Sequence, residues 1–252
     1  MTQRTFAIGD IHGDLKQLSK LMSRLPVLTK DDTVVFMGDY LDRGPDSKGV
    51  IRYLMRLPAK TPAKIVFLRG NHEDGWLRAL GGNWPEFILP VHNGCLQTME
   101  SYLDRPISEL GSAPESEDWA QLMKGSFFPP DVLEWMEKLE WYYEDKYAIY
   151  VHAGLPEIDG RFIHPSEAEG KNKTALLWMR KKKFFKEYAG KPVVIGHTVT
   201  SQLPPELSTF TPEDPDDLWA GPAVIGIDTG CGGDGFLTAV EFPSMLVYES
   251  RN

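Results

Sequence analysis

The chain has 252 residues, of which 42% are hydrophobic, enough for one large α/β domain with a sizeable core. Lys and Arg number 27 against 36 for Asp and Glu, and this net charge of −9, without a long basic segment, argues against binding of nucleic-acid polymers. Two cysteines, Cys95 and Cys231, are too few for a disulfide framework. No secretory signal or membrane-spanning apolar run is visible, so we expect a soluble, cytoplasmic protein that makes no contact with a membrane.

The first predicted element is a strand over residues 5–8, which runs into the sequence GDIHGD at 9–14. Extended backbone sends alternate side chains to opposite faces, so Asp10 and His12 would leave the strand end on one side. A carboxylate and an imidazole placed together can both bind a metal ion. The alternative is an ordinary turn, in which Asp bonds its own backbone and Gly supplies a positive φ. The hexapeptide alone favours the turn, and the rest of the chain has to decide.

The same pattern, a short apolar run that ends in a polar residue beside glycine, recurs along the chain. Runs at 33–37, 64–68, 147–151 and 192–195 lead into GDYLDRG (38–44), RGNHED (69–74), HAG (152–154) and GHT (196–198). Apolar residues at helical spacing over 15–25 and 50–55 predict two helices between the first strands, and Pro26 and Pro58 mark the ends of these helices. Alternating strands and helices indicate an α/β sheet, whose strands converge with their carboxyl ends on one crevice. We therefore expect the polar residues to share a site.

The remaining segments are a helical insert and a closing set of strands. The run 223–227 leads into DTGCGGDG (228–235), and 236–242 and 245–248 are predicted antiparallel strands. Residues 74–141 interrupt the alternation of strands and helices, because they contain no clear strand pattern and hold five of the seven tryptophans. We predict one domain over 1–252 with an aromatic-rich helical insert around 74–141. Its tryptophans are interpreted as core, with a wall for the substrate as the alternative.

Taken together, GDIHGD, GDYLDRG, LRGNHED, VHAGL and IGHT resemble the motifs of the calcineurin-like metallophosphoesterases. Within that superfamily the chain is similar to the phosphoprotein phosphatase family, in its bacterial and phage-type branch. The resemblance runs from residue 9 to at least 198 and implies an αββα sandwich, two mixed sheets flanked by helices. It departs from the eukaryotic serine/threonine phosphatases at Ala153 and at 228–231, so their regulatory-subunit binding and toxin sensitivity are not carried over.

The ligand set in these motifs combines carboxylate, amide and imidazole groups without a thiolate, which suits a catalytic site for Mn²⁺, Fe or Zn²⁺. The resemblance implies that two divalent metal ions are bound, with Mn²⁺ as the first expectation. It assigns Asp10, His12 and Asp39 to one ion, and Asp39, Asn71, His152 and His197 to the other, so that Asp39 bridges them.

The resemblance also assigns the residues that act on the substrate. Arg43 and Arg180 would bind phosphate oxygens through the guanidinium fork. Arg180 opens the basic run 180–183, for which a solvated helix face is the alternative. His72 resembles the general acid of the family, with Asp42 orienting its imidazole. Arg69 is given a structural role, and no role is assigned to His92 or His164.

The implied activity is removal of phosphate from phosphoserine or phosphothreonine in a phosphoprotein or phosphopeptide, by direct attack of a metal-activated water, with phosphotyrosine as a further substrate. The alternative is hydrolysis of a dinucleoside polyphosphate such as diadenosine tetraphosphate. His12 favours the first, because symmetrical tetraphosphatases typically show glutamine at this position. A metal-holding scaffold without catalysis is a third hypothesis. It is disfavoured because every expected ligand is present, together with His72 and Asp42.

Overall fold

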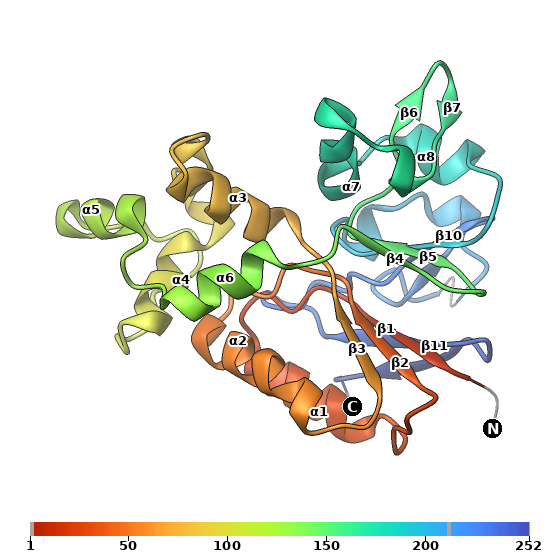
Figure 1. The fold of residues 1–252 in the computed structure, drawn as a ribbon, viewed down its shortest axis with the longest axis horizontal. Coiled ribbons are helices and arrows are strands. Elements are labelled where there is room, and N and C mark those ends of the chain that lie inside the picture. Colours follow the sequence, from red (N-terminus) through yellow and green to blue (C-terminus); the bar gives the residue numbers. More distant parts are fainter. Residues whose placement is uncertain (1–2, 211–212, 252) are drawn as a thin grey trace.

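Two five-stranded sheets pack face to face in the computed structural model of the protein, which describes residues 3–210 and 213–251 (Figure 1). The first sheet contains β1 (Thr5–Ile8), β2 (Thr33–Phe36), β3 (Lys64–Phe67), β11 (Thr238–Phe242) and β12 (Leu246–Glu249) in the order β12-β11-β1-β2-β3. Strands β1, β2 and β3 are parallel, whereas β11 and β12 complete the sheet in antiparallel fashion. The first sheet is therefore mixed.

The second sheet is built in the same way. It contains β4 (Tyr142–Glu144), β5 (Ile149–Val151), β8 (Val193–Ile195), β9 (Trp219–Ala220) and β10 (Val224–Gly226) in the order β4-β5-β8-β10-β9. Its three inner strands are parallel and its two edge strands are antiparallel to their neighbours. A separate hairpin joins β6 (Glu157–Ile158) to β7 (Arg161–Phe162).

Helices flank both sheets. The α-helices are α1 (Leu15–Arg24), α2 (Ser47–Arg56), α3 (Asn71–Leu80), α4 (Cys95–Tyr102), α5 (Ser116–Lys124), α6 (Pro130–Glu137), α7 (Ala175–Trp178) and α8 (Lys182–Glu187). Short 3₁₀ turns are η1 (Leu57–Ala59), η2 (Pro85–Ile88), η3 (Val91–Asn93), η4 (Pro165–Glu167), η5 (Gly170–Thr174), η6 (Thr200–Gln202) and η7 (Pro205–Leu207). None of the helices in the described ranges is long and apolar enough to cross a membrane.

The layers follow from the alternation of side chains along each strand. In β1, Phe6 and Ile8 join the core beneath α1 and α2, whereas Ala7 joins the core between the sheets. In β8, Val194 faces the first sheet, whereas Val193 and Ile195 pack with residues of α7 and α8. Because both faces of each sheet are buried, its strands are short continuous apolar runs. The predicted αββα sandwich is confirmed.

The helical insert lies beside the first sheet rather than over its face (Figure 1). Its helices α3 to α6 share the core of α1 and α2, with Trp76, Leu96 and Met136 buried in it. The first helix of the insert starts at Asn71, directly after β3, so two predicted site residues lie in its first turn. The insert is thereby tied to the site by a continuous helix.

Candidate active site

The predicted site residues lie at the carboxyl ends of strands from both sheets. Asp10 follows β1, Asp39 follows β2 and Asn71 follows β3, while His152 follows β5 and His197 follows β8. The two sheets meet here, because the backbone N–H of His197 donates to Asp10 Oδ2 at 2.9 Å. All five side chains are buried. The structure therefore brings five side chains that are spread from residue 10 to residue 197 of the sequence into one cluster.

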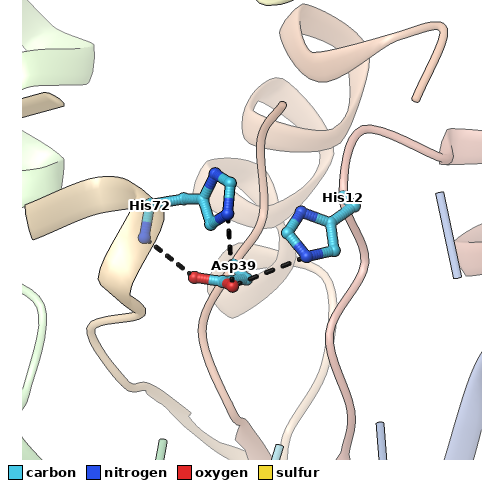
Figure 2. A group of neighbouring side chains, drawn as sticks. All are labelled: His12, Asp39 and His72. Atoms are coloured by element: carbon cyan, nitrogen blue, oxygen red, sulfur yellow. Dashed lines mark hydrogen bonds and ion pairs between the residues drawn. The ribbon is translucent and has the colours of Figure 1, made fainter. Parts of the chain in front are cut away.

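Asp39 is the centre of this cluster, and both of its carboxylate oxygens face imidazole rings, two at Oδ2 and one at Oδ1. Oδ2 lies 3.5 Å from His12 Nε2 and 3.9 Å from His72 Nε2, and Oδ1 lies 3.5 Å from His152 Nε2. Figure 2 shows His12 and His72 pointing toward this carboxylate from opposite sides. The backbone N–H of His72 also donates to Oδ1 at 3.0 Å. A side chain shared in this way has the position that a bridging ligand requires.

Asn71 holds the second group of ligand atoms together. Its Oδ1 lies 2.9 Å from His152 Nε2 and 2.6 Å from His197 Nδ1. The amide oxygen and two imidazole nitrogens thus converge from α3, β5 and β8. Asp39, His152 and His197 form one group whose ligand atoms lie within 4.8 Å of one another. His12, Asp39 and His72 form the other such group found in the described ranges.

The backbone around these ligands adopts conformations that most residues avoid. His12, Asp39, Asp42, Arg43 and His197 all have positive φ, between 44° and 71°. Such strain persists only where the surrounding structure enforces it, and it gathers at functional sites. The expectation that extended backbone places Asp10 and His12 on one side is wrong, because β1 ends at Ile8 and His12 lies in a left-handed turn.

Glycine beside the ligands allows close approach of the backbone. A Cβ atom on Gly196 would lie 2.0 Å from Asp10 Oδ1, and one on Gly70 would lie 2.1 Å from Asp39 Oδ1. Both contacts are far inside van der Waals distance, so any side chain here would displace a ligand carboxylate. The recurring glycines in the motifs follow from this crowding.

Three of the four histidines are prepared to donate a lone pair. The Nδ1–H groups of His12 and His152 donate to the carbonyls of Leu41 and Met37, at 3.1 and 2.8 Å, which leaves each Nε2 free to accept. Burial lowers the pKa of His12, and it also lowers the pKa of His152 and His197. These rings are therefore neutral, the form that binds a metal ion.

His72 differs from the other three histidines. Burial alone would lower its pKa, but the carboxylates of Asp39 and Asp42 outweigh burial and raise it. Its Nδ1–H donates to Asp42 Oδ2 at 2.7 Å. Its Nε2 lies 3.3 Å from Arg43 Nη2. Of the four rings, that of His72 is therefore the most readily protonated.

Asp42 is fixed by residues of the insert and of α4. Trp76 Nε1 donates to both carboxylate oxygens, at 2.9 and 3.1 Å, and the Thr98 hydroxyl donates to Oδ1 at 2.6 Å. Thr98 and Ser47 hydroxyls in turn accept from the backbone N–H of Asp42. With hydrogen bonds from His72, Trp76 and Thr98 and no exposed surface, the carboxylate has one orientation toward His72.

The two predicted phosphate-binding arginines flank the ligand cluster. Arg43 is half-buried beside His72. Arg180 is exposed and donates from Nη2 to the carbonyl of His197 at 3.0 Å. It lies between α7 and α8 and so is not part of a solvated helix face. Arg69 instead donates to the carbonyls of Met136 and Glu137, in keeping with the structural role expected of it.

Two buried carboxylates of the site were not singled out from the sequence. Glu73 accepts from the backbone N–H groups of Asp39, Tyr40 and Gly70, at 2.8 to 3.0 Å, and so fixes the turn that carries the bridging residue. Burial and the nearby Asp39 raise the pKa of Glu73 to about 8. Asp228 is buried close to Asp10, and burial followed by this neighbour raises the pKa of Asp10. Glu73 lies within the motif RGNHED and Asp228 within DTG, so their positions in these motifs could have identified them from the sequence.

The residues present fit two divalent cations. Asp10 Oδ1 and His197 Nε2 are buried without a hydrogen-bond partner in the described structure, which is costly unless a ligand binds there. The donor set of oxygen and imidazole nitrogen, with no thiolate, suits Mn²⁺, Fe or Zn²⁺. Distances alone would let His72 replace Asp10 in the first group. The pKa of His72 is raised, whereas the pKa values of His12, His152 and His197 are lowered, and this difference argues against His72 as a metal ligand.

A double-sheet α/β sandwich with two groups of potential metal ligands around a shared aspartate at its strand ends is the arrangement expected of a metal-dependent phosphoesterase. The family model described as calcineurin-like phosphoesterase matches residues 4–221. The chain therefore belongs to the calcineurin-like phosphoesterase family.

Similar proteins include members with two different substrates in their names. Over 80 residues, 32% of this chain, the protein is 40% identical to serine/threonine-protein phosphatase PP1-1 of Saccharomyces cerevisiae and 41% identical to a symmetrical bis(5'-nucleosyl)-tetraphosphatase of Legionella pneumophila. These matches span only 26% and 28% of the relatives. The crystal structure of a candidate diadenosine tetraphosphatase aligns with a TM-score of 0.57 and 20% identity, over 99% of this chain and 93% of that one, which shows a shared fold.

Proposed function

We propose that the protein is a dinuclear-metal phosphomonoesterase that removes phosphate from phosphoserine, phosphothreonine or phosphotyrosine in proteins. The observation that carries this proposal is the position of His72. It lies beside the shared carboxylate of Asp39, yet its other ring nitrogen is committed to Asp42 at 2.7 Å. A proton donor next to a pair of cation sites is the arrangement that phosphate-ester hydrolysis needs.

Asp10, His12 and Asp39 would hold one cation, and Asp39, Asn71, His152 and His197 would hold the other. The cations would supply an activated water and neutralise charge on the phosphoryl oxygens. Spontaneous hydrolysis of phosphate monoesters is among the slowest reactions known, so electrostatic stabilisation has to provide most of the acceleration.

Arg43 and Arg180 orient the substrate in this proposal. The Arg43 fork lies next to His72, and Arg180 lies on the other side of the cluster beside His197. Two guanidinium groups on opposite sides can bind the phosphoryl oxygens and align the scissile bond. Without substrate, Arg43 donates to His72 Nε2. When Arg43 binds phosphate instead, Nε2 is free to carry the proton for the leaving oxygen.

Asp42 has two roles toward His72. It accepts from Nδ1–H, which places the exchangeable proton on Nε2, and its charge stabilises the protonated ring. Trp76 and Thr98 hold Asp42 rigidly and so keep the acid aimed at the site. They are positioning residues.

The second candidate is a dinucleoside-tetraphosphate hydrolase, favoured by the similarity to the Legionella enzyme. The test is hydrolysis of a phosphopeptide and of diadenosine tetraphosphate by the same chelated preparation, with Mn²⁺ added back. We expect the phosphopeptide to be the better substrate by kcat/KM. A strong preference for the dinucleotide would reverse this order, and no hydrolysis of either, or of p-nitrophenyl phosphate, would favour a non-catalytic scaffold.

A further inference from the structure

A chain of aromatic rings connects the two ends of the candidate active site. Starting at His72, it runs through Phe87, Trp84 and Trp178 to His197, with neighbouring ring centroids 5.4 to 5.8 Å apart. Phe87 and Trp84 come from the insert and Trp178 comes from α7, and Figure 1 shows α3 of the insert and α7 opposite each other. The rings therefore form one wall along the predicted position of the phosphate.

The wall is exposed only in its middle. Phe87 is buried, whereas Trp84 and Trp178 are both half-buried. Arg78 packs its guanidinium over the Trp84 ring, 4.8 Å from the centroid, and Trp84 and Trp178 meet at an interplanar angle of 70°. Two tryptophans that fix each other edge to face offer a rigid apolar surface for a third ring. A role in the core alone would not require Trp178 to contact His197 or Trp84 to contact Trp178.

The surface behind Trp178 is positively charged. Trp178, Arg180, Lys171 and Lys181 line one groove together with Glu157. Glu157 is already paired with Lys181 at 3.6 Å and with Lys183. Arg180 and Lys171 make no ion pair within residues 3–210 and 213–251. On a chain of net charge −9, such a groove is a local exception and is complementary to carboxylates.

We propose that Trp84 and Trp178 bind the aromatic ring of phosphotyrosine and that Lys171 and Lys181, in the groove behind Trp178, bind acidic residues flanking it in the peptide. This inference rests on the proposed phosphatase function. The phenolic ring is one oxygen atom away from phosphorus, so a phosphate held between His72 and His197 brings the ring against the wall. Phosphoserine has no ring to place there. In a dinucleoside tetraphosphate cleaved symmetrically, further phosphates and a ribose separate each base from the scissile bond.

The test compares peptides of identical sequence that carry either phosphotyrosine or phosphoserine, each with acidic or neutral flanking residues. In Trp178→Ala, kcat/KM for phosphotyrosine is expected to fall about tenfold more than kcat/KM for phosphoserine, within the range of aromatic pair energies. Trp178→Phe should retain most of the discrimination. Trp119→Leu removes a partly buried tryptophan of α5 that makes no ring contact with Trp84 or Trp178 in the described residues, and should leave the ratio unchanged.

Replacing both lysines, Lys171→Gln with Lys181→Gln, should reduce the preference for acidic flanks several-fold, and added salt should reduce it in the wild type. Equal losses on both phosphopeptides in Trp178→Ala, at wild-type metal content, would overturn the inference while leaving the phosphatase function intact. So would a loss confined to diadenosine tetraphosphate, which would make the wall a nucleobase site. Failure of the wild-type protein to cleave any phosphopeptide would instead refute the proposed function.

Discussion

Replacing Asp42 with asparagine tests whether His72 works as an acid. The carboxylate accepts from His72, from Trp76 through both oxygens and from Thr98, so an amide NH₂ must face a donor wherever it is placed. Placed toward His72, it forces Nδ1 to become an acceptor, and it removes the charge that stabilises the protonated ring. Placed toward Trp76 and Thr98, it opposes the indole N–H, which can only donate.

The size of the effect follows from these contacts. Loss of general-acid catalysis lowers kcat by about 10²- to 10⁴-fold. Loss of charge-assisted hydrogen bonds at a fully buried position costs about 1.5–3 kcal/mol in the free energy of unfolding. Because the Asp42 carboxylate contacts His72, Trp76 and Thr98 rather than an assigned metal ligand, metal content should stay near that of the wild type.

The assay is hydrolysis of phenyl phosphate and of p-nitrophenyl phosphate at equal metal loading. The nitrophenolate departs without a proton, so Asp42→Asn should affect p-nitrophenyl phosphate much less than phenyl phosphate. Thr98→Ser, which keeps the hydroxyl that Asp42 accepts from, is the matched control and should behave like the wild type. An equal loss on both substrates, or a parallel loss of metal, would refute the acid role.

Three further predictions follow from single contacts. Asp39→Asn should weaken both cations together, because each oxygen of Asp39 faces a different group of ligands; metal analysis that finds one ion fully retained would count against the bridge. Arg43→Lys should lower kcat/KM by about 10- to 100-fold with metal content unchanged, because lysine lacks the planar fork; near-normal kinetics would remove Arg43 from phosphate binding. The Arg4–Asp32 pair, with Nη2 and Oδ2 2.8 Å apart, concerns stability. Burial raises the pKa of Asp32, but the hydrogen bonds from Arg4 and Thr29 have the larger effect and lower it overall. The pair therefore stabilises the fold fully above the unfolded carboxyl pKa of about 4, and this stabilisation is lost as the pH falls through the lower pKa of the folded state. Urea unfolding of Asp32→Asn should thus show a loss of about 1–3 kcal/mol at pH 7 that shrinks in acid, and a loss independent of pH would contradict this.

Much of the fold could be predicted because its strands are short apolar runs with turn residues at their ends. Each of the six apolar runs that precede a polar motif contains a strand, and the polar residues after five of them do meet. The edge strands β4 and β9 have only three and two residues, too few for a periodic pattern, and were not predicted.

The chemistry of the site was predictable only as far as the motifs reach. The left-handed turns at His12 and Asp39 lie against each other, with the backbone N–H of His12 donating to the carbonyl of Asp39 at 2.8 Å, and the sequence shows only flanking glycines. Trp76, Thr98 and the Trp84–Trp178 pair act across 34, 56 and 94 residues of chain. Such contacts are set by how the insert folds back on the site, which no local spacing in the sequence records. The interpretation of the insert's tryptophans as core holds for Trp76, which is buried, and Trp84, Trp119 and Trp135 pack partly buried against the same core.

The central claim is that two cations share Asp39 while His72 binds neither. Anomalous diffraction at the manganese edge, from crystals grown with Mn²⁺, tests it directly. Two peaks are expected about 3.5–4 Å apart on either side of the Asp39 carboxylate, one beside Asp10 and His12 and one beside Asn71, His152 and His197. A single peak, or a peak coordinated by His72, would contradict it.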